Sequence, residues 1–186
     1  MPAPCNGPAP EKHWYYMIFI GLGANLPSEA HGTPLATCEA ALDALAAAGV
    51  KVRRRSRWYR SAPQPASDQP WFVNGVAEVA AGLVPADLLA LMHRIETDFG
   101  RRPGAANAAR VIDLDLLAYG QMVSGAGAAL RLPHPRLHER AFVLYPLAEL
   151  APRWRHPATG HDLETLISAL DGTQRCEPME DAPETP

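Results

Sequence analysis

The sequence predicts an α+β sandwich with a mostly antiparallel sheet. Two observations lead to this prediction. Strand patterns and helix patterns alternate in the order βαββαβ, and further helical patterns follow them. The chain has 186 residues, of which 47% are hydrophobic, and this is enough for one domain with a buried core.

The first half of the chain opens with an apolar run. Residues 14–22 are rich in aromatic and aliphatic side chains and end before a glycine, which predicts a buried strand. Thr33 and Pro34 form an N-cap followed by a helix-starting proline, and apolar residues at intervals of three and four continue up to Gly49. Residues 50–59 are rich in arginine and predict a strand near a sheet edge.

The second half repeats the alternation. A proline-rich loop over residues 61–71 leads to a strand pattern at 72–80. Pro85 then begins an amphipathic helix that ends at Gly100. Residues 111–119 form the clearest strand pattern. A glycine-rich hairpin and two helical patterns complete the chain, near residues 120–128, 136–150 and 162–170.

The two ends of the chain have the composition of disordered tails. Residues 1–13 contain four prolines, residues 171–186 contain acidic side chains and three prolines, and neither segment shows apolar periodicity. We therefore expect one domain over residues 14–170. The chain has no apolar run long enough for a membrane span and no pattern of a secretory signal, so we expect a cytoplasmic protein.

Charge and cysteine content exclude several kinds of protein. A formal net charge of -3 argues against a general nucleic-acid binder, which normally carries a basic excess. Three cysteines at these spacings suit neither a disulfide framework nor a zinc site. We expect a monomer whose partners are small molecules, without nucleic-acid or membrane partners.

The strongest sign of chemistry is the segment 110–117, Arg-Val-Ile-Asp-Leu-Asp-Leu-Leu. Because side chains alternate along a strand, Asp113 and Asp115 share one face and their apolar neighbours point into the core. Two adjacent carboxylates repel each other unless a cation compensates. Magnesium usually takes one or two carboxylates together with substrate phosphates and water. The alternative is an exposed strand face on which two acids happen to fall.

A basic loop precedes this strand. Arg101, Arg102 and Arg110 bracket a loop of glycine, proline and alanine over residues 101–109. A mobile basic loop beside a metal-binding strand is suited to closing over a polyphosphate. The alternative, a solvated loop kept soluble by arginine, stays open for Arg102 in particular.

Six short motifs together make the sequence resemble a known family. Over about residues 15–170, their order and approximate gaps resemble those of 6-hydroxymethyl-7,8-dihydropterin pyrophosphokinase. The motifs are Gly23-Ala24-Asn25-Leu26, Trp58-Tyr59-Arg60-Ser61, residues 68–74, Glu96 with Gly100-Arg101, residues 110–117, and Pro133-His134-Pro135 followed by Arg140-Ala141-Phe142. Two departures stand out: many members read Gly-Ser-Asn in the first motif, and many carry a tryptophan in the loop before the acidic strand. Here Asn107 lies near that position.

The resemblance implies a fold, a reaction and cofactors. The fold is a ferredoxin-like α+β sandwich with additional helices. The reaction transfers pyrophosphate from ATP, as co-substrate, to the hydroxymethyl group of a reduced pterin, an early step of folate synthesis. Two magnesium ions would be bound by Asp113 and Asp115, and Arg101 and Arg110 would hold phosphates.

The resemblance also implies residues for each substrate. Asn74 would bind the amide edge of the pterin, a role that its paired donor and acceptor suit. The further pterin contacts would be Ser61, Gln64, Phe72 and Phe142, with the two phenylalanines on either side of the ring. The contacts near ATP would be His93, Glu96, Leu116, His134 and Arg140. As alternatives, the phenylalanines are core residues and His134 is a turn residue between two prolines.

Two other functions compete with this hypothesis. A metal-dependent phosphohydrolase would use the same aspartates, but it leaves Asn74 and the two phenylalanines without a role. A catalytically silent pterin- or nucleotide-binding module would explain the missing loop aromatic, but it needs no paired metal site.

Overall fold

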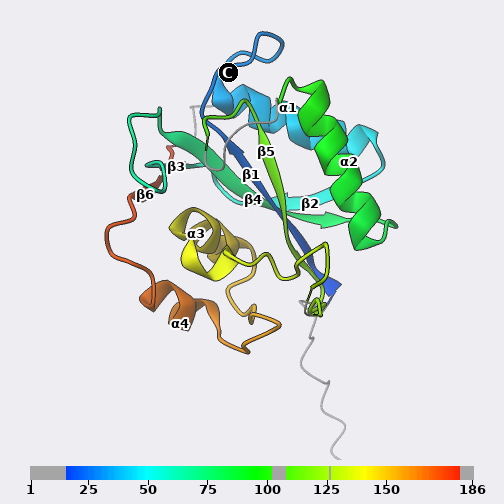
Figure 1. Cartoon of the computed structure of the whole chain (residues 1–186), viewed down its shortest axis with the longest axis vertical. Helices are drawn as coiled ribbons and strands as arrows, with labels where there is room; N and C mark the ends of the chain where they lie inside the picture. Colours follow the sequence, from blue (N-terminus) through cyan, green and yellow to red (C-terminus); the bar gives the residue numbers. More distant parts are fainter. Residues whose placement is uncertain (1–15, 102–107, 126, 181–186) are drawn as a thin grey trace, which may run out of the picture.

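The computed structural model describes residues 16–101, 108–125 and 127–180 (Figure 1). The tail predicted at residues 1–13 and the loop residues Arg102 and Asn107 lie outside the described residues.

One six-stranded sheet forms the centre of the molecule, in the order β5-β1-β4-β3-β6, with β2 also paired to β4. β1 (Ile18–Ala24) lies between β4 (Phe72–Ala80) and β5 (Asp113–Tyr119), and both pairings are antiparallel. β2 (Lys51–Arg55) and β3 (Tyr59–Ser61) pair one after the other with the outer side of β4. The arrangement confirms the predicted α+β fold with an antiparallel sheet.

Helices cover both faces of this sheet (Figure 1). α1 (Pro34–Ala47) and α2 (Pro85–Asp98) lie on one face. A short 3-10 helix, η2 (Leu137–Glu139), leads into α3 (Ala141–Leu150), which lies on the other face beside α4 (Leu163–Ser168). Each face therefore has its own buried apolar cluster. Within the described ranges, no helix is long and apolar enough to cross a membrane.

The predicted helix boundaries follow from local chemistry. Thr33 caps α1, because its Oγ1 accepts a hydrogen bond from the Ala36 amide at 3.2 Å. Pro34 is the first helical residue, where its missing N–H costs nothing. Gly49 and Gly100 follow the two helices at φ values of 86° and 87°, a left-handed conformation that favours glycine.

Two predicted strands differ from the structure. β1 begins at Ile18 rather than at residue 14, and Tyr16 before it is 85% exposed. The segment predicted as one strand over residues 50–59 forms β2 and β3, which are separated by residues 56–58. There Ser56 turns its hydroxyl to the Val76 amide at 3.1 Å, so the chain leaves regular pairing before β3 begins.

The prediction of a disordered tail over residues 171–186 is wrong for the part that the structure describes. Residues Cys176–Pro178 form strand β6, which pairs antiparallel with β3. Its order comes from backbone pairing with β3, a strand more than 100 residues earlier, and from Met179, which packs against the apolar cluster beneath α1 and α2. Composition alone carries no sign of such a long-range contact.

Candidate active site

A cleft of about 390 Å³ opens on the α3 face of the sheet. Two glycines of β1, Gly21 and Gly23, form part of its floor, where the central strand has no side chains to fill the space. A Cβ at Gly23 would lie 3.0 Å from Oδ1 of Asn74, so a larger residue there would crowd that amide. Side chains at these two positions would occupy part of the cleft.

The strand register arranges polar groups around this floor. Gly23 pairs with Asp113 on one side and with Asn74 on the other, while Gly21 pairs with Asp115. Adjacent strands lie about 4.8 Å apart, so the backbones of Asp113 and Asn74 are about 10 Å apart on the same face. The carboxylates and the amide therefore stand on opposite sides of the floor, with room between them for a small molecule.

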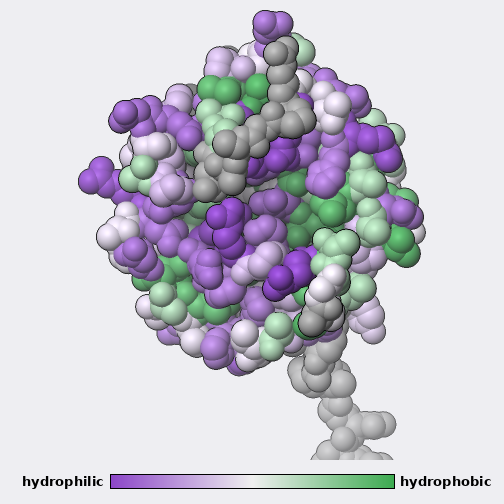
Figure 2. Space-filling model, in the orientation of Figure 1, coloured by the Kyte–Doolittle hydropathy of each residue, from purple (hydrophilic) through white to green (hydrophobic). Residues whose placement is uncertain are grey.

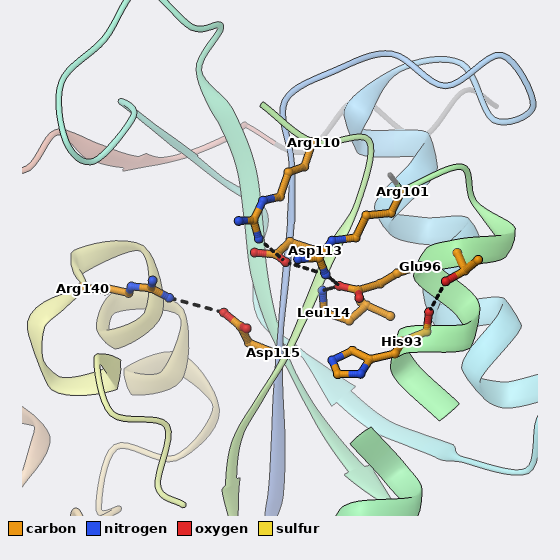
Figure 3. A network of polar contacts seen from close by, with 9 residues as sticks. His93, Glu96, Arg101, Arg110, Asp113, Leu114, Asp115 and Arg140 are labelled. Carbon is orange, nitrogen blue, oxygen red and sulfur yellow. Dashed lines mark hydrogen bonds and ion pairs between the residues drawn. The ribbon is translucent and has the colours of Figure 1, made fainter. Parts of the chain in front are cut away.

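Three arginines surround the two carboxylates (Figure 3). Nη1 of Arg110 lies 2.6 Å from Oδ1 of Asp113, and Nη1 of Arg101 lies 3.0 Å from the same oxygen. From the side of α3, Nη1 of Arg140 lies 3.3 Å from Oδ2 of Asp115. Both aspartate side chains remain partly exposed to the cleft, at 26% for Asp113 and 33% for Asp115. The site combines two partly exposed carboxylates with basic groups that can bind phosphate.

Glu96, on α2, holds this network of arginines and aspartates in place. It is 2% exposed on α2, forms an ion pair with Arg101 and accepts a hydrogen bond from the Leu114 amide at 2.7 Å. Burial raises the pKa of Glu96, an effect that the Leu114 amide and Arg101 oppose. Glu96 thus ties β5 to α2 and orients Arg101, although it does not line the cleft itself.

Asn25, at the end of β1, holds the backbone of Arg110. Its Oδ1 accepts a hydrogen bond from the backbone amide of Arg110 at 2.7 Å, and its own backbone amide donates to the Arg110 carbonyl at 3.0 Å. Asn25 is 2% exposed. The first and fifth sequence motifs therefore meet in space, and the side chain of Arg110 is directed from a fixed backbone.

The opposite side of the cleft carries the residues that the sequence predicts for a pterin. Asn74 is 4% exposed, and its Nδ2 donates to Oγ of Ser61 at 2.8 Å. Gln64, Phe72 and Phe142 line the same cleft. An amide beside aromatic rings can recognise the edge of a flat heterocycle while the rings cover its faces.

His134 and Arg140 lie between the two sides. The His134 amide donates to the Leu117 carbonyl at 2.8 Å, and its Nδ1 accepts from the Arg136 amide at 3.2 Å. Burial lowers the pKa of His134, an effect that Asp115 opposes, and so favours the neutral ring. Because Nδ1 accepts a hydrogen bond, the proton of the neutral ring lies on Nε2. Burial likewise lowers the pKa of Arg140, whose guanidinium lies 5.3 Å from the Phe142 ring centroid.

The structure brings most of the predicted residues together in this one cleft: Ser61, Gln64, Phe72, Asn74, Arg110, Asp113, Asp115, His134, Arg140 and Phe142. Arg101 joins them through Asp113. His93 is exposed on α2, where its carbonyl accepts from Thr97 Oγ1 (Figure 3). The side chain of Leu116 is buried in the core beneath α1 and α2, on the sheet face opposite the cleft.

Among the residues that line the cleft, three with polar side chains were not singled out in the sequence analysis, namely Arg136, Glu139 and Gln174. Arg136 directly follows Pro133-His134-Pro135, Glu139 ends η2, and the charge of both was a usable signal. Gln174 comes from the segment predicted as a tail, and no pattern around it pointed to the cleft. Figure 2 shows hydrophilic residues near the centre of the face in view.

The donor set of the cleft fits magnesium. Asp113 and Asp115 offer hard carboxylate oxygens, and magnesium completes its shell with substrate phosphates and water. Among the described residues, no group of three or more His, Cys, Asp or Glu could hold a metal ion. The arrangement therefore suits an ion that arrives with a phosphate ligand rather than one held by protein alone.

Comparisons with known proteins agree with this geometry. A family model described as 7,8-dihydro-6-hydroxymethylpterin-pyrophosphokinase matches residues 19–152. The 2-amino-4-hydroxy-6-hydroxymethyldihydropteridine pyrophosphokinase of Synechocystis sp. is 39% identical over 83% of this chain and 76% of its own length. The protein of the same name from Pseudomonas aeruginosa is 38% identical over 85% of this chain and 95% of its own length. The mitochondrial folate synthesis bifunctional protein of Arabidopsis thaliana is 37% identical over 72% of this chain, which covers 23% of that protein.

Proposed function

The chain belongs to the 7,8-dihydro-6-hydroxymethylpterin-pyrophosphokinase family, and we propose that it carries out this family's reaction in the cleft between Asn74 and Asp113. The chain is a pyrophosphokinase of folate synthesis, an enzyme that transfers pyrophosphate from ATP. The acceptor is the hydroxymethyl group of 6-hydroxymethyl-7,8-dihydropterin.

One observation carries the assignment of the site. The register of β5, β1 and β4 sets two carboxylates and a buried amide on one face, with glycine between them. A pterin bound at Asn74 would direct its side group across Gly23 towards Asp113. Phosphates bound near the aspartates would then meet the hydroxymethyl group over the glycine floor.

We assign two magnesium ions to Asp113 and Asp115. Bound there with ATP, magnesium supplies charge neutralisation for the transferred pyrophosphate and helps to align the attack. The carboxylates are partly exposed and face the cleft, so they are accessible to an ion that enters with the nucleotide.

The arginines change partners in this proposal. In the structure, Arg101 and Arg110 share one oxygen of Asp113, and Arg140 contacts Asp115. When the nucleotide binds, their guanidinium groups turn to phosphate oxygens, which accept the same paired N–H donors. The neutral His134 donates from Nε2 to a phosphate oxygen. These groups stabilise the negative charge that develops during transfer.

The chemical step is a displacement at phosphorus. The pterin hydroxyl oxygen forms a bond to the β-phosphorus of ATP, the bond from that phosphorus to the α,β-bridging oxygen breaks, and AMP leaves with that oxygen. The hydroxyl proton passes to solvent, since no side chain of the described cleft is assigned as a general base. Positioning and electrostatics carry most of the catalysis in reactions of this type.

The test is product analysis by NMR with ATP, magnesium and 6-hydroxymethyl-7,8-dihydropterin. We expect AMP and pterin pyrophosphate in equal amounts, formed only when pterin is present. Asp113→Asn and Asp115→Asn should each lower turnover by about 100-fold or more without unfolding the chain. ADP or free phosphate would instead indicate a phosphohydrolase, and pterin binding without turnover would indicate a silent binding module. A cytoplasmic location and a monomeric state stay predictions from the sequence.

A further inference from the structure

A segment near the end of the chain contacts both sides of the cleft. After α4 the chain runs back towards the sheet and reaches β6 beside β3, at the red end of the colour scale in Figure 1. The family model ends its match at residue 152, so this segment lies outside the matched part. Its contacts are with residues that the proposed function places around the pterin.

Gln174 contacts the start of α3. Its Oε1 accepts a hydrogen bond from the Ala141 amide at 2.9 Å, and its Nε2 donates to the Glu139 carbonyl at 2.8 Å. The first amides of a helix have no partner within the helix, and a nearby side chain usually satisfies them. Arg140, the N-cap residue of α3, makes no such side-chain bond. Gln174 therefore caps the N-terminus of α3, although it lies more than 30 residues later in the chain.

This cap fixes the backbone on which two cleft residues stand. Arg140 lies between the two backbone groups that Gln174 holds, and Phe142 follows directly after them. Arg140 reaches Asp115 from there, and its guanidinium lies over the Phe142 ring. Gln174 itself lines the cleft. A shift of this backbone would move both side chains together.

The residues after Gln174 contact the other side of the cleft. Ser61 pairs with Cys176, and the Ala62 amide donates to the Arg175 carbonyl at 3.0 Å. β3 has only three residues, and β6 covers the side of it that β4 leaves free. The same short segment thus holds the backbone that leads from Ser61 into the loop with Gln64.

From these contacts we infer that Gln174 is a positioning residue for the pterin. Gln174 is hydrogen-bonded to the start of α3, and the residues that follow it are paired with Ser61 and Ala62. Together they set the distance between the Phe142 side and the Ser61–Gln64 side of the cleft. The inference rests on the proposed function for the identity of the ligand. The contacts themselves do not depend on it.

The test compares Gln174→Met with the full wild-type chain. Methionine has a similar length but can neither accept from Ala141 nor donate to Glu139 in the same way. We expect the pterin KM to rise about tenfold while kcat stays within about twofold, the effect of losing two side-chain hydrogen bonds. Amide hydrogen exchange of Ala141 should become faster in the same variant.

Two further variants separate positioning from general stability. Gln174→Glu keeps an oxygen acceptor for Ala141 at a helix N-terminus, where negative charge is favourable, but it loses the donor to the Glu139 carbonyl. Its pterin KM should therefore lie between those of Gln174→Met and the wild-type chain. Asp162→Ala removes the cap of α4, in which Asp162 Oδ1 accepts from the Thr165 amide at 3.0 Å. This control should lower Tm but leave the pterin KM unchanged.

The KM and exchange measurements on these variants decide whether Gln174 positions the pterin site. An unchanged pterin KM in Gln174→Met, no recovery in Gln174→Glu, or an equal rise in Asp162→Ala would overturn the inference. If the wild-type chain forms no pterin pyrophosphate, the proposed function fails instead. Ala141 exchange then decides the inference alone: faster exchange in Gln174→Met supports the anchoring role, and unchanged exchange overturns it.

Discussion

At the scale of single residues, the burial of Asn74 supports its proposed contact with the pterin. An amide side chain has two donor and two acceptor sites, and leaving them unsatisfied in the interior costs free energy. Asn74 is 4% exposed, donates to Ser61 and sits beside a glycine that leaves its Oδ1 facing the cleft. A heterocycle with matching donors and acceptors would complete its hydrogen bonds.

We expect Asn74→Ala to weaken pterin binding by about 10- to 100-fold, the usual effect of leaving a ligand's hydrogen bonds unmade in a buried site. ATP binding should change little, because Asn74 lies on the other side of the floor from Asp113. Isothermal titration of each ligand separately would measure both affinities.

Ser61→Ala is the matched control for this prediction. It removes the partner of the Asn74 amide but keeps the amide itself, so the loss of pterin affinity should be smaller than in Asn74→Ala. Equal affinity of Asn74→Ala and the wild-type chain for pterin would contradict the assignment.

At the scale of the elements, β2 is attached to β4 by a charge pair as well as by backbone pairing. Glu78 is 3% exposed on β4, and Nη2 of Arg54 on β2 lies 2.5 Å from its Oε2. Nε of Arg54 also donates to this oxygen at 2.9 Å. A buried carboxylate depends on such a partner, because burial removes the water molecules that would otherwise solvate its charge.

We expect Arg54→Met to lower the free energy of unfolding by about 1–3 kcal/mol, because Glu78 would remain buried without its cation. Half of the Arg54 side chain is exposed, so water can replace part of the lost interaction. Urea denaturation would measure the change. The double variant Arg54→Met with Glu78→Gln should regain part of the stability, and no recovery would show that packing rather than charge is lost.

At the scale of the whole molecule, stability and metal binding should be separate. Arginines already contact Asp113 and Asp115, so the folded state does not need a metal to balance these carboxylates. We expect EDTA to abolish turnover but to change Tm by less than about 1 °C. Differential scanning calorimetry with and without EDTA would measure this, and a large fall in Tm would indicate a structural metal.

The pH dependence of stability should contain a contribution from His156. This residue is 4% exposed, packs beside Trp154 and His138, and neither of its ring nitrogens has a hydrogen-bond partner among the described residues. Burial lowers its pKa below the ordinary value of 6.5, and His138 and His161 add to the effect.

The sign follows from proton binding. Between the lowered pKa of the folded state and 6.5, the unfolded chain binds a proton that the folded chain does not, so the free energy of unfolding falls as pH falls through this window. When the pH falls from 7.5 to 5, the Tm of His156→Phe should fall by about 2–4 °C less than the Tm of the wild-type chain. Thermal melts at both pH values would check it, and parallel curves would contradict it.

Local patterns in the sequence were sufficient for both long helices, for most of the strands and for the main chemical groups. Helix starts at Thr33 and Pro85, and the shared face of Asp113 and Asp115, follow from interactions within a few residues. The motif order was also sufficient for the family, which the comparisons confirm over residues 19–152. Such features depend on backbone propensity and side-chain alternation, which a linear sequence contains directly.

Only the tertiary structure decided which of these groups meet. The pairing of Gly23 with both Asp113 and Asn74, and the contact of Gln174 with Ala141, join residues that are far apart in the chain. The same holds for β6, whose composition predicted disorder. Long-range backbone pairing depends on the register of the whole sheet, and the free energy that orders residues 174–178 comes from strands and a helix folded elsewhere.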